Sequence, residues 1–154
     1  RGNGIGIEFR NEIKPITIGK GMIVKQWEHI VLLCYGTLIK ECLEADIALK
    51  KLGFNITIVD ARFVKPLDEE MILKLIKNHY ILITIEEGSI GGFASHVNNF
   101  LIQGNHLDSK LKIKNIFLPD IFLQQDTQEN QYIKAGLNSH SIVDCVTSMT
   151  KIDR

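Results

Sequence analysis

The sequence lacks a net charge of either sign and a long apolar run. Its 154 residues carry 18 basic and 18 acidic side chains, and 45% of the residues are hydrophobic. Because the basic residues are scattered and balanced by acids, no long-range field would attract nucleic acid or an anionic membrane. No apolar stretch approaches the roughly 20 residues that cross a bilayer. We therefore expect a soluble globular domain with no nucleic-acid or membrane partner.

Paired cysteines and a signal peptide are also missing. Cys34, Cys42 and Cys145 are an odd number and form no C-x-x-C motif, which predicts buried, reduced thiols. The start, Arg1-Gly2-Asn3-Gly4, lacks the apolar segment of about 7–15 residues that a signal peptide has. It resembles the middle of a longer protein.

Regular structure is predicted mainly from residue 29 onward. Residues 1–28 hold five glycines and Pro15, and form an irregular segment with one short strand at 22–25. Continuous apolar runs predict buried strands at 30–35, 56–59, 81–85 and 113–118. Apolar residues three and four apart predict helices at 38–52, 67–76, 93–101 and 127–135, and one from 139.

The alternation of strands and helices determines the expected fold class. Such alternation predicts right-handed βαβ units and a parallel sheet. We expect an α/β protein, a three-layer α/β/α domain whose mostly parallel sheet has about five strands, with 22–25 as a candidate antiparallel edge. Thr37 is the expected cap of the first helix, and Gly53 and Gly136 are expected to end helices.

Two glycine-containing segments resemble phosphate sites in part. Gly19-Lys20-Gly21 fails the G-x-x-x-x-G-K-[ST] pattern, because Lys14 stands at the position of the first glycine, neither Gly21 nor Met22 is a Ser or Thr, and no helix follows. The turn at 88–92 precedes a helix whose free amides could bind an anion, but it does not match G-x-G-x-x-G. The favoured interpretation is a tight turn that allows close packing, including packing against another subunit.

Glu86 and Glu87 end a predicted strand, where ligands of parallel sheets bind. Adjacent strand residues point to opposite faces, so the two carboxylates cannot share one substrate. We expect one to be solvated and the other to be held by amides or an arginine.

Neither a metal site nor a catalytic triad is predicted. The five histidines form no H-x-x-H or H-x-x-x-H, and Ser89 lacks the G-x-S-x-G elbow. His96 is the one histidine placed near the strand ends, and a helix-cap or interface role is favoured for it.

Several stretches together resemble 1-deoxy-D-xylulose-5-phosphate synthase. The discriminating ones are Asp60–Asp68 (DARFVKPLD) and Ile83–Phe93 (ITIEEGSIGGF), and Arg1–Gly4, Tyr35–Thr37 and Leu118–Asp120 occur in the same order. The resemblance is to the C-terminal part of that family. Transketolase and the pyruvate dehydrogenase β subunit share the architecture, with looser versions of D-x-R-x-x-x-P-L-D.

The resemblance implies a larger, thiamine-diphosphate-dependent parent enzyme. Residues 1–28 would be the end of a pyrimidine-binding domain and a linker, and 29–154 a transketolase C-terminal-like domain. The parent would join pyruvate to D-glyceraldehyde 3-phosphate, supplying isoprenoid, thiamine and pyridoxal biosynthesis. Thiamine diphosphate and Mg²⁺ would bind upstream, because the Gly-Asp-Gly signature does not occur here. This part alone is expected to bind no cofactor or metal and to be inactive.

The same resemblance implies roles for a few residues. Arg1 matches an arginine that contacts the substrate phosphate, which suits a planar guanidinium. The domain is expected to pack against the upstream domains and across a two-fold homodimer. Candidates for the dimer interface or crevice are Glu86, Glu87, Gly88, Gly91, Gly92 and His96. Asp126 stands where the family usually has glycine, so a positive φ there would be strained.

Three interpretations remain open at this stage. The chain could be an assembly domain of the synthase, a regulatory module that binds an anion or nucleotide in the crevice, or the equivalent domain of a transketolase or oxo-acid dehydrogenase β subunit. The resemblance and the Ile-, Lys- and Asn-rich composition point to a plastid-type, apicoplast-like organelle or a bacterial cytoplasm.

Overall fold

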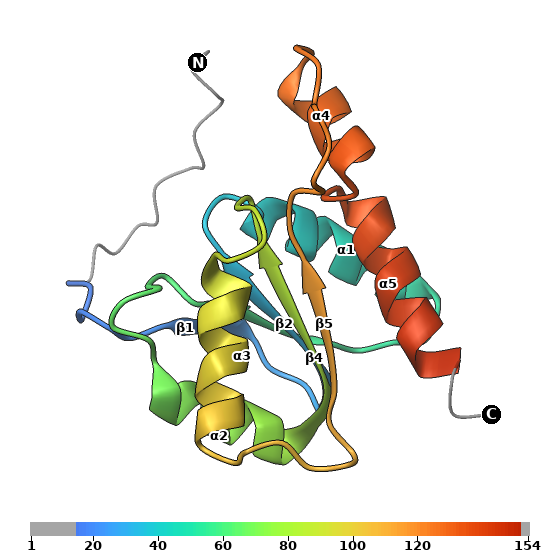
Figure 1. Ribbon diagram of the computed structural model, residues 1–154. Coiled ribbons are helices and arrows are strands. Elements are labelled where there is room, and N and C mark those ends of the chain that lie inside the picture. Colours follow the sequence, from blue (N-terminus) through green and yellow to red (C-terminus); the bar gives the residue numbers. More distant parts are fainter. Residues whose placement is uncertain (1–14, 152–154) are drawn as a thin grey trace.

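The computed structural model describes residues 15–151, so Arg1 and the predictions on residues 1–14 lie outside the described residues. Within this part the elements, labelled in Figure 1, are β1 (Met22–Lys25), β2 (His29–Tyr35), α1 (Ile39–Lys51), β3 (Thr57–Asp60), α2 (Glu69–Asn78), β4 (His79–Glu86), α3 (Phe93–Gln103), β5 (Lys112–Ile116), α4 (Gln128–Ala135) and α5 (Ser139–Lys151). None of the described helices is long and apolar enough to cross a bilayer.

The strands form a single sheet in the order β1-β3-β2-β4-β5. β2 pairs in parallel with β3 and with β4, and β4 pairs in parallel with β5. β1 is the antiparallel edge strand and pairs Met22 with Asp60. The predicted α/β fold with a mostly parallel sheet and one antiparallel edge is confirmed.

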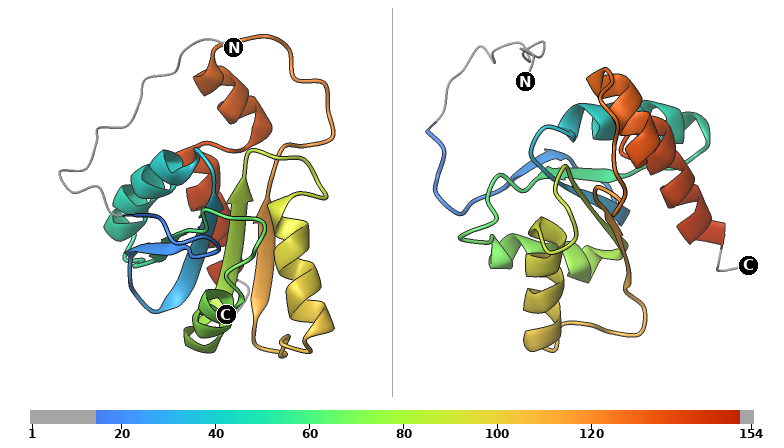
Figure 2. Two further views of the ribbon diagram at one scale, coloured as in Figure 1. Left: turned by 90° about the vertical axis from the view of Figure 1, so that its left-hand side faces the viewer. Right: turned by 45° about the horizontal axis from the view of Figure 1, so that its top comes forward.

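Helices cover both faces of the sheet, because alternate residues of a buried strand point in opposite directions. Leu32 and Cys34 belong to a core cluster with α1 and α5. Val31 and Leu33 belong to a second cluster with α2 and α3. Figures 1 and 2 show these helix pairs on opposite sides of the sheet, with α4 beyond the carboxyl ends of the strands. The three-layer arrangement is as expected.

Three local predictions need correction. The N-cap of α1 is Leu38 without a side-chain cap bond, so Thr37 is not the cap. β4 begins at His79 because α2 runs directly into it, and the polar pair before Ile81 concealed this start. β5 ends at Ile116, since the Leu118 amide donates to the Gly88 carbonyl at 2.8 Å, which places residue 118 in the following loop.

Two of the three cysteines and the two helix-ending glycines agree with expectation. All three cysteines are free, and Cys34 and Cys42 are buried as predicted, whereas Cys145 is half-buried rather than buried. A contact with Cys34, together with burial, raises the pKa of the Cys42 thiol well above its usual value. Gly53 and Gly136 have φ of 86° and 71°, the left-handed conformation that ends a helix.

Candidate functional site

The sheet has a topological switch point at the carboxyl ends of β2 and β4. From β2 the chain first crosses to β3 on one side and then returns to β4 on the other side. Open α/β sheets bind ligands at such points. Here the Thr37 hydroxyl donates to Glu87 Oε2 at 2.6 Å, and the Tyr132 hydroxyl lies 3.4 Å from the same Thr37 oxygen. Polar side chains from both strand ends and from α4 therefore meet at the predicted crevice.

The chemistry of this meeting point is that of hydrogen bonding. Burial raises the pKa of Tyr132, so its hydroxyl stays protonated at neutral pH. Gln128 Nε2 donates to that hydroxyl at 3.0 Å. Glu87 is exposed and already accepts a hydrogen bond from the Thr37 hydroxyl. These groups can donate and accept hydrogen bonds and so can bind a polar ligand.

Glu86 has a different environment from its neighbour. It is 3% exposed, and its two carboxylate oxygens accept from the backbone amides of Phe93 at 2.9 Å and Ala94 at 2.8 Å. These are first-turn amides of α3, where a negative charge is favoured. The prediction that one glutamate is held by amides while the other is solvated is confirmed.

The glycines of the turn at 88–92 make room for that buried carboxylate. A Cβ on Gly88 would lie 2.5 Å from Glu86 Oε2, and a Cβ on Gly92 would overlap the same oxygen. Gly91 has φ of 98°, which a side chain would strain. The close approach predicted for this turn is thus made by Glu86. Because Glu86 occupies the amides of Phe93 and Ala94, these amides are not free for an external anion.

His96 lies apart from the crevice. It lines a shallow hollow of about 450 Å³ with Lys65, Glu69 and Phe100, among others, between the segment before α2 and one side of α3. Neither Thr37 nor Glu87 lines this hollow. The structure therefore brings Glu86, Glu87 and the three glycines together but places His96 elsewhere.

Residues 19–21 are held against the start of α2. Lys20 Nζ contacts Asp68 Oδ1 at 3.2 Å, and the Gly21 amide donates to Asp68 Oδ2 at 3.0 Å. Asp68 is also the N-cap of α2 and accepts from the Met71 amide at 3.2 Å. Asp68 is not identified as a cap in the sequence analysis. The available signal was the acidic start of α2. The carboxylate holds this segment against α2, in agreement with the rejection of a phosphate loop.

Asp126 adopts no positive φ, so the strain considered for it does not occur. Its Oδ1 accepts from the Thr127 amide and from Asn130 Nδ2, both at 2.8 Å, and its Oδ2 lies 2.7 Å from Lys134 Nζ. The Lys134 ammonium, followed by these hydrogen bonds, lowers the pKa of Asp126 to about 2. Asp126 therefore stabilises the start of α4. Across residues 15–151 no three His, Cys, Asp or Glu side chains gather as a metal site would require.

Comparison with known proteins identifies the family to which this fold belongs. The family model of the transketolase C-terminal domain matches residues 19–142. The chain belongs to this family. A solved structure described as "Split gene transketolase, inactive beta4 tetramer" superposes with a TM-score of 0.78 at 24% identity, which is a likeness of fold. The match covers 90% of the present chain and 45% of the other, so this domain spans less than half of that protein.

Proposed function

We propose that this domain is the C-terminal part of a 1-deoxy-D-xylulose-5-phosphate synthase and that it serves assembly rather than catalysis. The stretches Asp60–Asp68 and Ile83–Phe93 support the synthase within the transketolase family. In this proposal the upstream domains hold thiamine diphosphate and Mg²⁺, and the cofactor supplies the carbanion chemistry that joins pyruvate to D-glyceraldehyde 3-phosphate. The domain contributes buried surface to a homodimer.

The assembly role rests on the way the turn at 88–92 presents Ile90. This side chain is 74% exposed, although the turn beneath it is held by the buried Glu86 carboxylate. The loop bearing Ile121 and Phe122 is joined to the turn by the Leu118–Gly88 hydrogen bond. Phe122 is 92% exposed and Ile121 61%. Exposed apolar side chains on a fixed backbone are suited to a subunit contact.

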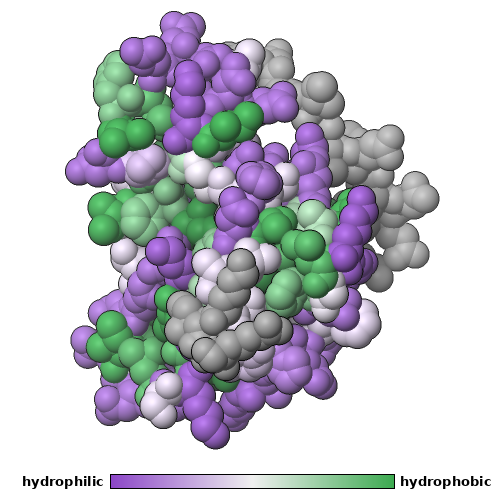
Figure 3. Space-filling view, turned by 90° about the vertical axis from the view of Figure 1, so that its right-hand side faces the viewer, coloured by the Kyte–Doolittle hydropathy of each residue, from purple (hydrophilic) through white to green (hydrophobic). Residues whose placement is uncertain are grey.

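The space-filling view supports a contact surface near the same end of the sheet. Figure 3 shows apolar side chains among polar ones around α4, at the top of the molecule. Ile133 of α4 is 54% exposed. A related structure is described as a tetramer of β chains, so a protein of this fold does assemble. We extend that property to a homodimer here.

The proposal is tested by reconstitution. The upstream domains are refolded with and without this chain, and dimerisation and release of CO₂ from pyruvate in the presence of D-glyceraldehyde 3-phosphate are measured. We expect both to depend on the chain. Equal dimerisation and equal turnover without it would refute the assembly role.

A transketolase parent is the second candidate, because the family and the structural neighbour both carry that name. The same reconstituted protein separates the two when it is offered pyruvate with the aldehyde or a ketose phosphate with an aldose phosphate. Carboligation from pyruvate supports the synthase. Transfer from the ketose alone supports transketolase.

A further inference from the structure

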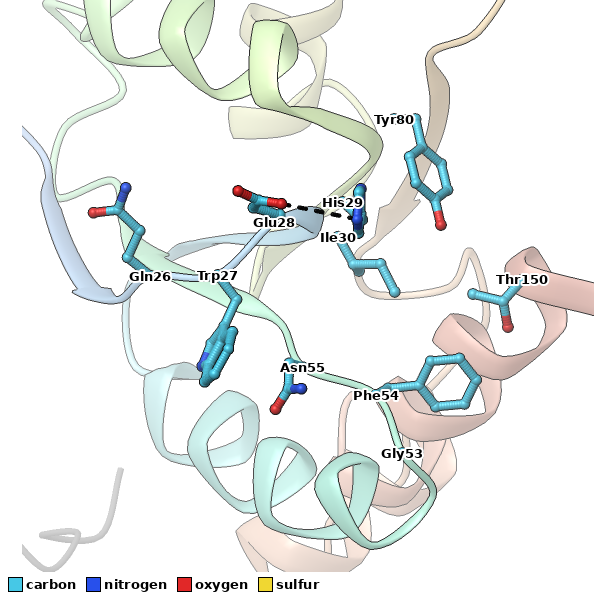
Figure 4. Close-up of a pocket in the computed structure, with 10 residues that line it drawn as sticks. All are labelled: Gln26, Trp27, Glu28, His29, Ile30, Gly53, Phe54, Asn55, Tyr80 and Thr150. Carbon is cyan, nitrogen blue, oxygen red and sulfur yellow. Dashed lines mark ion pairs between the residues drawn. The ribbon is translucent and has the colours of Figure 1, made fainter.

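The opposite end of the sheet carries a cavity that the proposed function does not use. It has a volume of about 730 Å³, within the roughly 300–1,000 Å³ of small-molecule sites. Its lining comes from the residues before and at the start of β2, from the α1–β3 connection, from β4 and from α5, as Figure 4 shows. These residues are Gln26, Trp27, Glu28, His29, Ile30, Gly53, Phe54, Asn55, Tyr80 and Thr150.

Aromatic side chains dominate this cavity. Trp27 and Tyr80 are 47% and 40% exposed, and Figure 4 shows them on opposite sides, with Asn55 beside Trp27 and with His29 and Ile30 between the two aromatic side chains. His29 lies against Tyr80, with the ring centroids 5.4 Å apart. Phe54 is half-buried and lines the side toward α5. Exposed aromatic faces offer stacking and cation–π contacts to a flat ligand.

The backbone that carries Trp27 is fixed by buried polar groups. The Trp27 amide donates to Thr57 Oγ1 at 2.9 Å, and the Thr57 hydroxyl donates to the Trp27 carbonyl at 2.6 Å. His79 Nε2 lies 3.1 Å from the same carbonyl. Thr57 and His79 are 0% and 7% exposed. The position of Trp27 is therefore preorganised, which reduces the entropy cost of binding.

A neighbouring residue shows an unusual conformation. His29 has φ of 76°, a value that few residues other than glycine adopt. Such a residue persists where the surrounding structure determines its conformation, as at binding sites. Its ring packs on Tyr80, and its Nε2 lies 4.0 Å from Glu28 Oε2.

The charges around the cavity favour a cation. Among the described residues that line the cavity, Glu28 carries the one formal charge apart from His29, and none is a lysine or arginine. The helices α1, α2, α3 and α5 all end at this side of the sheet, and helix C-termini bear partial negative charge. Lys50 and Lys51 lie in the last turn of α1 but not in the lining.

We propose that this cavity binds a small planar organic cation, stacked on Trp27 and Tyr80 with its charge toward Glu28. An anion finds no lysine or arginine among the lining side chains that the structure describes. A neutral planar molecule gains the stacking but lacks the attraction of Glu28. The site lies at the amino ends of the parallel strands, at the opposite end of the sheet from Thr37 and Glu87.

The test uses three probes of nearly the same shape: benzamidinium, benzamide and benzoate. Trp27 is the single tryptophan of the chain, so its fluorescence reports the cavity directly. We expect a saturable change with benzamidinium, binding of benzamide that is about threefold weaker or more, and no saturable change with benzoate. Calorimetry of the same titrations provides a second readout.

Variants distinguish the site from unspecific adsorption. Glu28→Gln should remove most of the preference for benzamidinium over benzamide, and Tyr80→Ala should weaken both by about twofold to fivefold. Phe122→Ala, an exposed aromatic outside the cavity, should leave the affinities unchanged. Unchanged melting curves verify that each variant is folded. Absence of saturable benzamidinium binding by both methods, or benzoate binding as tight, would overturn the proposal.

Discussion

Two helices of this domain, α3 and α4, begin beside a carboxylate from the preceding segment, but in opposite surroundings. Glu86 is buried and accepts two backbone amides of α3. Asp126 lies in an exposed loop and accepts from Thr127, Asn130 and Lys134 at the start and along the side of α4. α3 has four buried residues and α4 has none. The Glu86 carboxylate should therefore contribute much more to the free energy of unfolding than the Asp126 carboxylate, because unpaired polar groups are costly only where water is excluded.

The largest expected effect is that of Glu86→Ala. It leaves the amides of Phe93 and Ala94 buried without an acceptor and creates a cavity beneath the turn. We expect the free energy of unfolding to fall by about 2–4 kcal/mol, measured by urea denaturation. Glu87→Ala is the matched control, with an expected loss under about 0.5 kcal/mol. Similar losses for these neighbours would contradict the difference between the two environments.

A smaller loss is expected for Gly92→Ala, which places a Cβ against the Glu86 carboxylate. The clash should cost about 1–3 kcal/mol and shift the amide resonances of Phe93 and Ala94. Gly53→Ala is the comparison, since it has open space but φ of 86°, and backbone strain alone should cost about 1 kcal/mol. If Gly92→Ala is harmless, the close packing around Glu86 is wrong.

The local stability of the start of α4 should depend on pH. The pKa of Asp126 is about 2 in the folded protein and 3.8 ordinarily. Protonation therefore favours the form in which the start of α4 is unfolded. Its stabilising effect is present above about pH 4 and is lost as the pH falls toward about 2. Hydrogen-exchange protection of α4, corrected for intrinsic rates, should fall over this range while α5 changes less. Asp126→Asn should abolish the difference in pH dependence between α4 and α5. If the protection of α4 still falls with pH in this variant, Asp126 is not the group responsible.

Asp126→Gly, which introduces the residue expected at this position from the resemblance to the synthase family, should have the smallest effect. It removes the acceptor for Asn130 and Lys134 but leaves the Thr127 cap, whose hydroxyl accepts from the Asn130 amide at 3.3 Å. We expect exchange in α4 to quicken by a few-fold with an unchanged melting temperature. A fall of several degrees would mean that α4 contributes to the core.

The sequence was sufficient where one local rule dominated. The continuous apolar run of β2 and the spacing of Cys42, Ala45 and Leu49 on α1 predicted elements that the structure confirms. The alternation of side chains on a strand was enough to separate Glu86 from Glu87. The glycines around them indicated close packing, although not that Glu86 itself makes the contact.

Where the outcome depends on residues distant in sequence, local rules did not suffice. Thr37 has the right chemistry for a cap, but Glu87, 50 positions later, takes its hydroxyl. His79 can be buried at the start of β4 because Leu75, Thr57 and Trp27 offer partners to its ring nitrogens. The cavity beside Trp27 assembles residues from 26 to 150, and no sequence spacing indicates it.

The most direct test of the assembly role is the dimer dissociation constant of the reconstituted protein with wild-type chain and with Ile90→Glu, measured by sedimentation. Ile90 is exposed in the single chain, so its replacement should leave folding intact and weaken the dimer by tenfold or more, at a cost of about 1.4 kcal/mol for each tenfold. An unchanged dissociation constant, with the variant fully folded and incorporated, would contradict the account.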